Sequence, residues 1–180
     1  MLTRQIIEEA VNRALAEDAP WGDVTSEYLI PADSRAVATL EAREGGVMAG
    51  SAVFAAAFTA VDPSVVVDLK ISDGQSFSAG QQLAIVSGPA RAVLTGERVA
   101  LNFVQRMAGI ATATAKYVAA VAGTDARIVD TRKTTPGLRA FEKHSVVCGG
   151  GANHRYSLSD AVMAKDNHLA ILTRGGKDLT

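Results

Sequence analysis

The sequence predicts an α/β fold in two parts: a small α+β sandwich domain, followed by the first part of an incomplete α/β barrel. Two observations predict it. Residues 1–89 mix helical periodicity with short β-branched segments, and after residue 126 two short apolar segments each end in a polar loop. A strand that ends in a polar loop and recurs after an intervening segment is typical of a barrel. At 180 residues the chain is too short for a complete barrel, which needs about 250.

The N-terminal part begins with a predicted helix from Thr3 to about Ala16. Thr3 is a suitable N-cap, and Ile7, Val11 and Leu15 fall on one helical face. Residues 18–23 contain proline and glycine and should end this helix. A turn is expected at residues 73–74, and helices should lie beside a mostly antiparallel sheet. The remaining elements predicted here are strands 35–43, 65–71 and 83–86 and helix 51–61.

The second part begins at residue 90 with a predicted long helix to about Met107, where Gly109 should interrupt it before a second helix at 111–122. Apolar segments 127–130 and 161–164 are predicted strands. We therefore expect two domains, residues 1–107 and 108–180, and a loop from Arg174 to residue 178.

Charge and composition exclude several classes of function. The net charge is −1 and the pI is near 6.3, whereas nucleic-acid-binding domains more often have a pI above about 9. Residues 121–180 hold nine Lys and Arg against six Asp and Glu, a net +3 that favours a small anionic ligand. No apolar stretch approaches the ~20 residues of a membrane span. Cys148, the single cysteine, cannot form an internal disulfide, so we expect a cytoplasmic protein.

The strongest candidate site is Asp-Thr-Arg-Lys-Thr-Thr-Pro-Gly-Leu-Arg at residues 130–139, just past a predicted strand end, where α/β folds bind ligands. Arg132 has a planar guanidinium that suits a carboxylate or phosphate, Lys133 adds a point charge, and Thr131 offers a hydroxyl. A solvated basic loop is the alternative interpretation.

Two further segments carry candidate residues. In residues 148–155, three glycines would allow a close backbone approach or a sharp turn before His154 and Arg155, although a flexible turn explains them as well. In residues 163–168, Lys165 follows a predicted strand; it could form a Schiff base, bind an anion or be merely exposed. The spacing of the three histidines argues against a zinc site built from them.

Arg98 lies on the predicted long helix, where an arginine is usually just solvated. It becomes relevant to a ligand only if this helix meets another site or another subunit.

These segments, in this order, resemble the quinolinate phosphoribosyltransferase family. The resemblance extends to about His168, and the ten-residue motif at 130–139 is long enough to be specific. The matching segments include residues 22–25, 45–50, 97–102, 106–112, 130–139, 148–155 and 165–168.

The resemblance implies a reaction, a cofactor and an assembly. Quinolinate and phosphoribosyl pyrophosphate would give nicotinate mononucleotide, pyrophosphate and CO₂ with Mg²⁺, as a step of NAD biosynthesis. It also implies dimers or larger assemblies of dimers, in which Arg98 reaches the neighbouring subunit's site. The implied substrate-binding residues are Arg98, Thr131, Arg132, Lys133, His154, Arg155 and Lys165, with Lys133 and Lys165 as catalytic candidates and no metal ligand in this chain.

Family members run about a hundred residues further, so the resemblance also implies that this chain is a fragment with little or no activity alone. Three rival hypotheses stay open: a related phosphoribosyltransferase, a Schiff-base enzyme acting through Lys165, and a non-catalytic carrier or assembly domain. The carrier hypothesis comes from the glycine turns of residues 71–85, but no lysine occurs between Lys70 and Lys116 to carry a prosthetic group.

Overall fold

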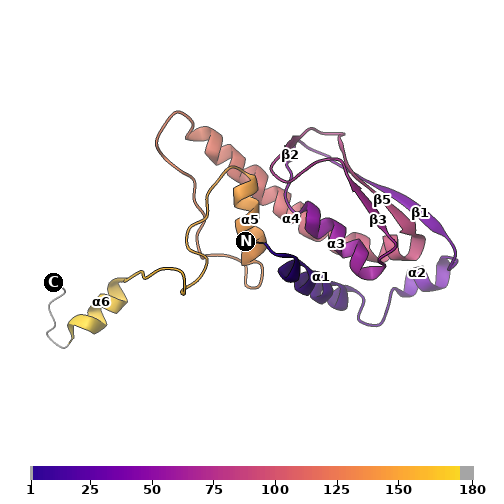
Figure 1. Ribbon diagram of the computed structural model, residues 1–180, viewed down its shortest axis with the longest axis horizontal. Helices are drawn as coiled ribbons and strands as arrows, with labels where there is room; N and C mark the ends of the chain where they lie inside the picture. The colour runs from indigo at the N-terminus through magenta and orange to yellow at the C-terminus, as the bar shows by residue number, and fades with distance from the viewer. Residues whose placement is uncertain (1, 175–180) are drawn as a thin grey trace.

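The computed structural model describes residues 2–174 and shows an N-terminal α+β unit, one long helix and a C-terminal arm (Figure 1). This agrees with the predicted α/β class. The elements in chain order are α1 (Arg4–Asp18), α2 (Val24–Leu29), β1 (Arg35–Glu41), β2 (Gly46–Val47), α3 (Ser51–Val61), β3 (Val66–Leu69), β4 (Ser76–Phe77), β5 (Gln82–Pro89), α4 (Ala90–Ala120), α5 (Arg139–Cys148) and α6 (Asp166–Thr173).

The sheet of the N-terminal unit is antiparallel, as predicted, in the order β1-β5-β3, and β2 and β4 form a separate short pair. Alternate residues of β1 turn inward, so Ala36, Ala38 and Leu40 pack on the core while their neighbours face solvent. On the inner side α3 packs against both α1 and α4, and α4 also contacts β1 and β5. The helices therefore cover one face of the sheet and bury the main core.

Side chains cap the N-termini of two helices in this unit. Thr3 caps α1, as predicted, by accepting a hydrogen bond from the N–H of Ile6 at 3.3 Å. Helix α2 was not predicted; its N-cap is Asp23, whose carboxylate accepts from the N–H of Ser26 at 3.0 Å. The helix is short, because only six residues follow the cap before Ile30.

Helix α4 corrects the expected break at Gly109: it runs unbroken over 31 residues from Ala90 to Ala120. Glycine inside a helix costs only about 1 kcal/mol relative to alanine. Met107 and Ala111, on either side of Gly109, are both fully buried. Their packing outweighs that cost and keeps the helix continuous.

The two predicted barrel strands are also corrected. Residues 127–130 form no strand; a single parallel bridge joins Val129 to Ala152. Residues 161–164 are irregular and exposed, with Val162 entirely accessible to solvent. A strand needs neighbours to satisfy its backbone groups, and the part of the chain that the structure describes offers these segments no further strand.

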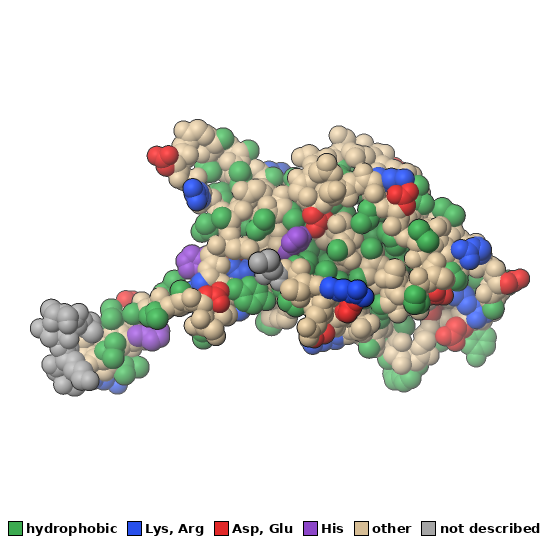
Figure 2. Space-filling view, viewed as in Figure 1, with side chains coloured by type: hydrophobic (Ala, Val, Ile, Leu, Met, Phe, Trp, Pro, Cys, Tyr) green, Lys and Arg blue, Asp and Glu red, His purple; other side chains and the backbone are tan. Residues whose placement is uncertain are grey.

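The C-terminal arm projects from the body and ends in α6, which has no buried residue (Figures 1 and 2). The predicted loop begins at Arg174, and its residues 175–178 lie outside the described residues. Between residues 2 and 174, no helix is both long enough and apolar enough to cross a membrane.

An ion pair ties α5 to the N-terminal unit. His144 Nε2 lies 2.7 Å from Asp73 Oδ2, and the Asp73 carboxylate also accepts from the N–H groups of Gly50 and Ser51 at 3.1 and 2.9 Å. Burial alone would raise the pKa of Asp73, but the hydrogen bonds from His144, Ser51 and Gly50 outweigh it and lower that pKa to about 2. The hydrogen bond to Asp73, and after it the nearby Cys148 side chain, raise the pKa of His144 to about 10. The imidazole is therefore charged at neutral pH.

Candidate functional site: a basic edge beside helix α5

The segments around Val129 and Ala152 run side by side in the same direction. Besides the bridge, the Ala152 N–H donates to the Ile128 carbonyl at 2.9 Å, and the Asp130 N–H donates to the Ala152 carbonyl at 3.1 Å. Residues that follow two parallel segments leave from the same edge. The structure therefore brings together five of the seven predicted binding residues: Thr131, Arg132, Lys133, His154 and Arg155. We call this region the basic edge.

A buried ion pair holds the start of both loops of the basic edge. The ammonium of Lys143, on α5, pairs with Asp130, and the two side chains are only 3% and 6% exposed. Lys143 Nζ also donates to the His154 carbonyl at 2.9 Å, and the His154 N–H donates to Asp130 Oδ1 at 2.8 Å. Asn153, with its amide nitrogen turned toward Asp130, donates to Oδ2 at 2.6 Å. The chain is thus fixed just before Thr131 and at His154.

Two arginines that the sequence reasoning did not single out brace the same loops. Arg139 donates to Thr134 Oγ1 at 3.1 Å and to the Tyr156 carbonyl at 3.2 Å, and its guanidinium lies 6.0 Å from the centre of the Tyr156 ring. It joins the loop after Asp130 to the loop after Ala152. Arg139 closes the ten-residue motif, so the sequence contained the signal, but its role depends on a contact 17 residues away.

Arg106, on α4, makes the second brace by binding Thr135 and Glu142. Burial alone would raise the pKa of Glu142, but hydrogen bonds from Arg106 and Thr135 outweigh it and hold that pKa below its usual range. The carboxylate therefore stays ionised and keeps the 131–138 loop against α4 and α5.

Arg132 has the environment of a ligand-binding side chain. Its Nε atom is buried and has no hydrogen-bond partner among the described residues. No hydrogen bond among the described residues engages the guanidinium of this half-buried side chain, so its planar set of N–H groups is free to bind a carboxylate or phosphate. Lys133 is exposed beside it. Thr131 is also exposed, and it shapes the loop because its Oγ1 accepts from the Lys133 N–H at 3.0 Å.

His154 and Arg155 complete the basic edge from the second loop. The His154 backbone is fixed by Asp130 and Lys143, while the residue itself is exposed. Arg155 is half-buried and donates from Nη1 to the Ala161 carbonyl at 2.9 Å, which leaves other guanidinium N–H groups available.

The three glycines before this loop serve packing more than ligand approach. A Cβ on Gly149 would lie 2.4 Å from the Ala111 carbonyl oxygen and 2.6 Å from Thr114 Cβ, and one on Gly151 would lie 2.7 Å from Val146 Cγ1. Gly149 thus lets the end of α5 lie directly on α4. Only Gly150 needs the conformational freedom of glycine, with φ of 85°.

Lys165 is placed apart from the basic edge. It precedes α6 on the arm and is exposed, and its backbone N–H donates to His168 Nδ1 at 3.1 Å. No hydrogen bond or ion pair within residues 2–174 connects it to Arg132, His154 or Arg155. Its assignment to the site stays a prediction.

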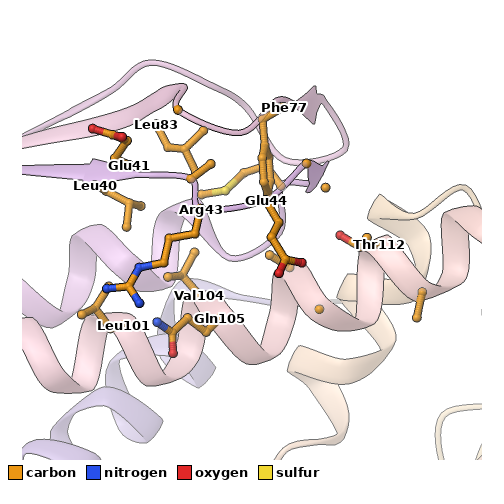
Figure 3. A pocket seen from close by; sticks show the side chains of 18 of the residues that line it. Leu40, Glu41, Arg43, Glu44, Phe77, Leu83, Leu101, Val104, Gln105 and Thr112 are labelled. Atoms are coloured by element: carbon orange, nitrogen blue, oxygen red, sulfur yellow. The ribbon is translucent and has the colours of Figure 1, made fainter.

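A groove of about 1440 Å³ lies between α4 and the loops at the end of the sheet (Figure 3). Arg98 lines this groove and so also lies apart from the basic edge. Arg98 is exposed, and the groove includes apolar side chains such as Leu40, Phe77 and Leu101. Its charged lining is balanced, so it does not select for an anion. The charged residues are Glu41, Glu44 and Glu97 against Arg43, Arg98 and Lys116.

The described residues do not fit a Mg²⁺ site at the basic edge. Mg²⁺ needs oxygen ligands with free lone pairs, usually one or two carboxylates. Here Asp130 is bound by Lys143, Glu142 by Arg106, and Asp160 by the N–H groups of Tyr156 and Ser157.

Comparison with known proteins decides the family. A family model described as "Quinolinate phosphoribosyl transferase, N-terminal domain" matches residues 23–108, and its C-terminal counterpart matches residues 110–177. The two domains occur in order and together cover most of the sequence. The chain belongs to the quinolinate phosphoribosyltransferase family. The glycine turns of residues 71–85 fall inside the N-terminal match, which accounts for them without a carrier domain.

Named relatives agree with this family. A protein of Bacillus subtilis (strain 168) named "Probable nicotinate-nucleotide pyrophosphorylase [carboxylating]" is 42% identical over 164 residues, covering 91% of this chain and 56% of that protein. A chloroplastic nicotinate-nucleotide pyrophosphorylase [carboxylating] of Oryza sativa subsp. japonica is 47% identical over 166 residues, covering 92% and 44%. The chain spans about half the length of these relatives.

Solved structures of the family share the fold. The crystal structure of NadC from Streptococcus pyogenes matches with a TM-score of 0.91 and 42% identity over 96% of this chain and 61% of that one. Human nicotinic acid phosphoribosyltransferase matches with a TM-score of 0.52 at 17% identity over 83% and 35%, which shows likeness of the fold alone. The N-terminal unit and the segment after it are thus arranged as in quinolinate phosphoribosyltransferases.

Proposed function

We propose that the protein carrying this chain transfers the phosphoribosyl group of phosphoribosyl pyrophosphate to quinolinate and releases pyrophosphate and CO₂, giving nicotinate mononucleotide for NAD biosynthesis. The relatives named above support the reaction class. The observation that carries the assignment here is Arg132, whose buried Nε lacks a partner at an edge that also holds His154 and Arg155. Quinolinate brings two carboxylates that such fixed cations bind and orient.

The residues of the basic edge, together with Lys165, divide the work as follows. Arg132, His154 and Arg155 hold the pyridine carboxylates, with Thr131 shaping the loop, so that the ring nitrogen faces the ribose carbon that loses pyrophosphate. Lys133 and Lys165 are the catalytic candidates that offset charge on the departing pyrophosphate. A carboxylate then leaves as CO₂. Its bonding electrons stay on the ring, stabilised by the positive nitrogen, and that ring carbon takes up a proton.

Mg²⁺ belongs to this proposal as an ion that accompanies the pyrophosphate group, because Mg²⁺ in such sites is commonly bound by substrate phosphates. Asp130 and Glu142 are engaged by Lys143 and Arg106, so no step here depends on these two carboxylates as Mg²⁺ ligands. A cytoplasmic location is also proposed, supported by the single cysteine. Cell fractionation with an antibody to the chain tests the location, and recovery in a membrane or organelle fraction would overturn it.

The proposed assembly is a homodimer in which Arg98 of one protomer completes the basic edge of its partner. Arg98 is exposed on α4, in a groove whose balanced charge and apolar walls suit a protein surface. Analytical ultracentrifugation should find a dimer, and Arg98→Ala should weaken quinolinate binding without changing the sedimentation coefficient. A monomer that binds quinolinate equally well with and without Arg98 would contradict this assembly.

Substrate preference separates the proposal from a nicotinate-specific phosphoribosyltransferase. Titration calorimetry of the 180-residue chain should show quinolinate binding about tenfold or more tightly than nicotinate, because nicotinate leaves one carboxylate position empty and a charged donor unpaired. Equal affinity for the two acids would favour the alternative enzyme.

A further inference from the structure

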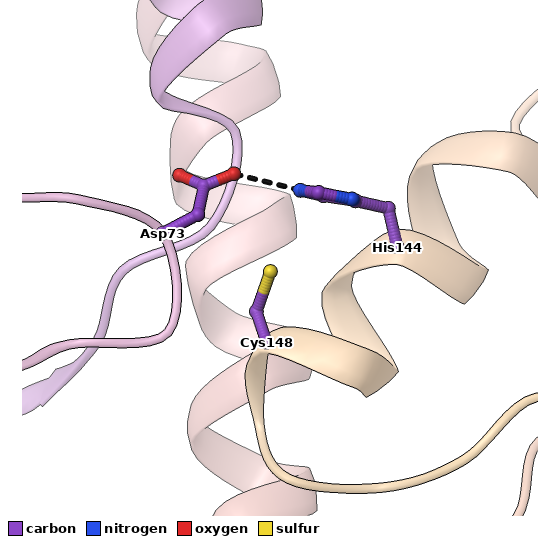
Figure 4. A group of neighbouring side chains, drawn as sticks. All are labelled: Asp73, His144 and Cys148. Atoms are coloured by element: carbon purple, nitrogen blue, oxygen red, sulfur yellow. Dashed lines mark hydrogen bonds and ion pairs between the residues drawn. The ribbon is translucent and has the colours of Figure 1, made fainter. Parts of the chain in front are cut away.

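A second cluster of reactive side chains lies where α5 meets the N-terminal unit. Asp73 comes from the turn between β3 and β4, while His144 and Cys148 come from α5 (Figure 4). His144 and Cys148 are four residues apart, so they lie on the same face of the helix. One ligand atom from each residue lies within 4.8 Å of the other two. All three residues are half-buried.

The backbone on both sides holds these donors in place. The Asp73 carboxylate is oriented by the N–H groups of Gly50 and Ser51 at the start of α3. Gly74 has φ of 85°, and a Cβ there would lie 3.6 Å from the Cys148 carbonyl oxygen, so the turn packs directly on the end of α5. Figure 4 shows the sulfur of Cys148 pointing toward the space between the carboxylate and the imidazole.

The chemistry of this set selects one class of ion. Thiolate, imidazole and carboxylate are the ligands of zinc, whereas Mg²⁺ and Ca²⁺ take oxygen ligands. Three protein ligands leave one position of a tetrahedral ion open. The side chains of His144 and Asp73 are 31% and 21% exposed, so water can reach that position. Hydrogen bonds to the coordinating carboxylate from Gly50 and Ser51 are the outer support that metal sites commonly show.

We propose that Asp73, His144 and Cys148 form a Zn²⁺ site, distinct from the basic edge, that ties α5 to the turn after β3. The ion takes the place of the proton shared by His144 and Asp73 and of the thiol proton of Cys148, and both protons pass to solvent. The sequence alone did not indicate this group of three ligands, because Asp73 lies 71 residues before His144. The three histidines also lack the spacing of a metal site.

Cys148 distinguishes this proposal from a simple ion pair. The Asp73–His144 contact needs no sulfur, so Cys148→Ser leaves that contact in place and removes only the thiolate. His168→Gln, on the exposed α6, removes a histidine outside the cluster and is the matched control.

The test uses the 180-residue chain freed of metal with a chelator and titrated with Zn²⁺ against a chromogenic indicator. We expect one tightly bound Zn²⁺ per chain, at least tenfold weaker binding in Cys148→Ser, and no change in His168→Gln. Circular dichroism checks that each variant is folded.

Co²⁺ gives a second, spectroscopic readout that reports on the sulfur ligand itself. Bound in place of Zn²⁺, it should produce a thiolate-to-cobalt charge-transfer band in the wild-type chain, and this band should be absent from Cys148→Ser. Zn²⁺ binding that is equal in the wild type and Cys148→Ser, or a Co²⁺ spectrum without the thiolate band, would overturn the proposal. Neither result bears on quinolinate binding, which is measured through Arg132.

Discussion

In the N-terminal unit, β5 pairs with β1 along its length and with β3 over four residues, whereas after α4 the described chain offers only the bridge between Val129 and Ala152. The core shows the same contrast, because only Ala140 and Phe141 of its buried apolar residues come after Ala111. Apolar burial and strand pairing stabilise the first region. The loops of the second are held by ion pairs and hydrogen bonds, so single polar substitutions there should have unusually large effects.

The largest effect is expected for Lys143→Met. It leaves Asp130 buried without its ion-pair partner, which costs about 3–5 kcal/mol in comparable buried pairs. Urea unfolding gives the free-energy change, and Lys116→Met, at an exposed position on α4, should change it by less than about 0.5 kcal/mol. Equal effects of the two substitutions would show that the buried pair does not hold the second region.

Packing of α5 on α4 predicts that one glycine substitution destabilises the protein and that another, away from the contact, stabilises it. Gly149→Ala would place its Cβ 2.4 Å from the Ala111 carbonyl oxygen and should destabilise the protein by about 1–3 kcal/mol. Gly109→Ala has open space in the middle of α4 and should stabilise it by about 0.5–1 kcal/mol. Thermal unfolding shows whether each variant is more or less stable than the wild type. A stabilising Gly149→Ala would contradict the close contact of the two helices.

A smaller effect should appear as a pH dependence of the Arg106–Glu142 brace. The pKa of Glu142 is lowered in the folded state, so its contribution is complete above its unfolded value of 4.5 and is lost as the pH falls through the folded value. Arg106 is about half exposed, which limits the contribution to about 0.5–1 kcal/mol. The free energy of unfolding should therefore drop less in Glu142→Gln than in the wild type between pH 6 and pH 3. If the free energies of unfolding of the two proteins changed in parallel with pH, the Arg106–Glu142 pair would not stabilise the fold.

The sequence was sufficient for local features of the first region and insufficient for long-range ones in the second. Thr3 as a cap and the helix at Ser51–Val61 were predicted because caps and apolar patterns act over a few residues. Gly109 was misread because packing on either side outweighs its helix propensity. The predicted strand at 161–164 failed because a strand requires partners that a local pattern does not supply.

In the candidate site, too, local sequence indicated some features, and others depend on long-range contacts. The residue types of the 130–139 motif indicated an anion site, and its position past a parallel segment agrees with that interpretation. The roles of Lys143, Arg139 and Arg106 depend on contacts 13, 17 and 36 residues away, which no local spacing reveals. The residue pattern offered Lys165 as a candidate, and the family resemblance assigned both Lys165 and Arg98 to the substrate site; the structure brings neither to the basic edge of its own chain.

The most direct test of the account compares the basic edge with the groove by removing one positive charge from each. Titration calorimetry of quinolinate should show about 10- to 100-fold weaker binding for Arg132→Ala, since a carboxylate of the ligand loses its charged hydrogen-bond donor. Lys116→Ala, in the groove, should bind like the wild type. Unchanged binding by Arg132→Ala, or an equal loss in both variants, would contradict the placement of the quinolinate site at the basic edge.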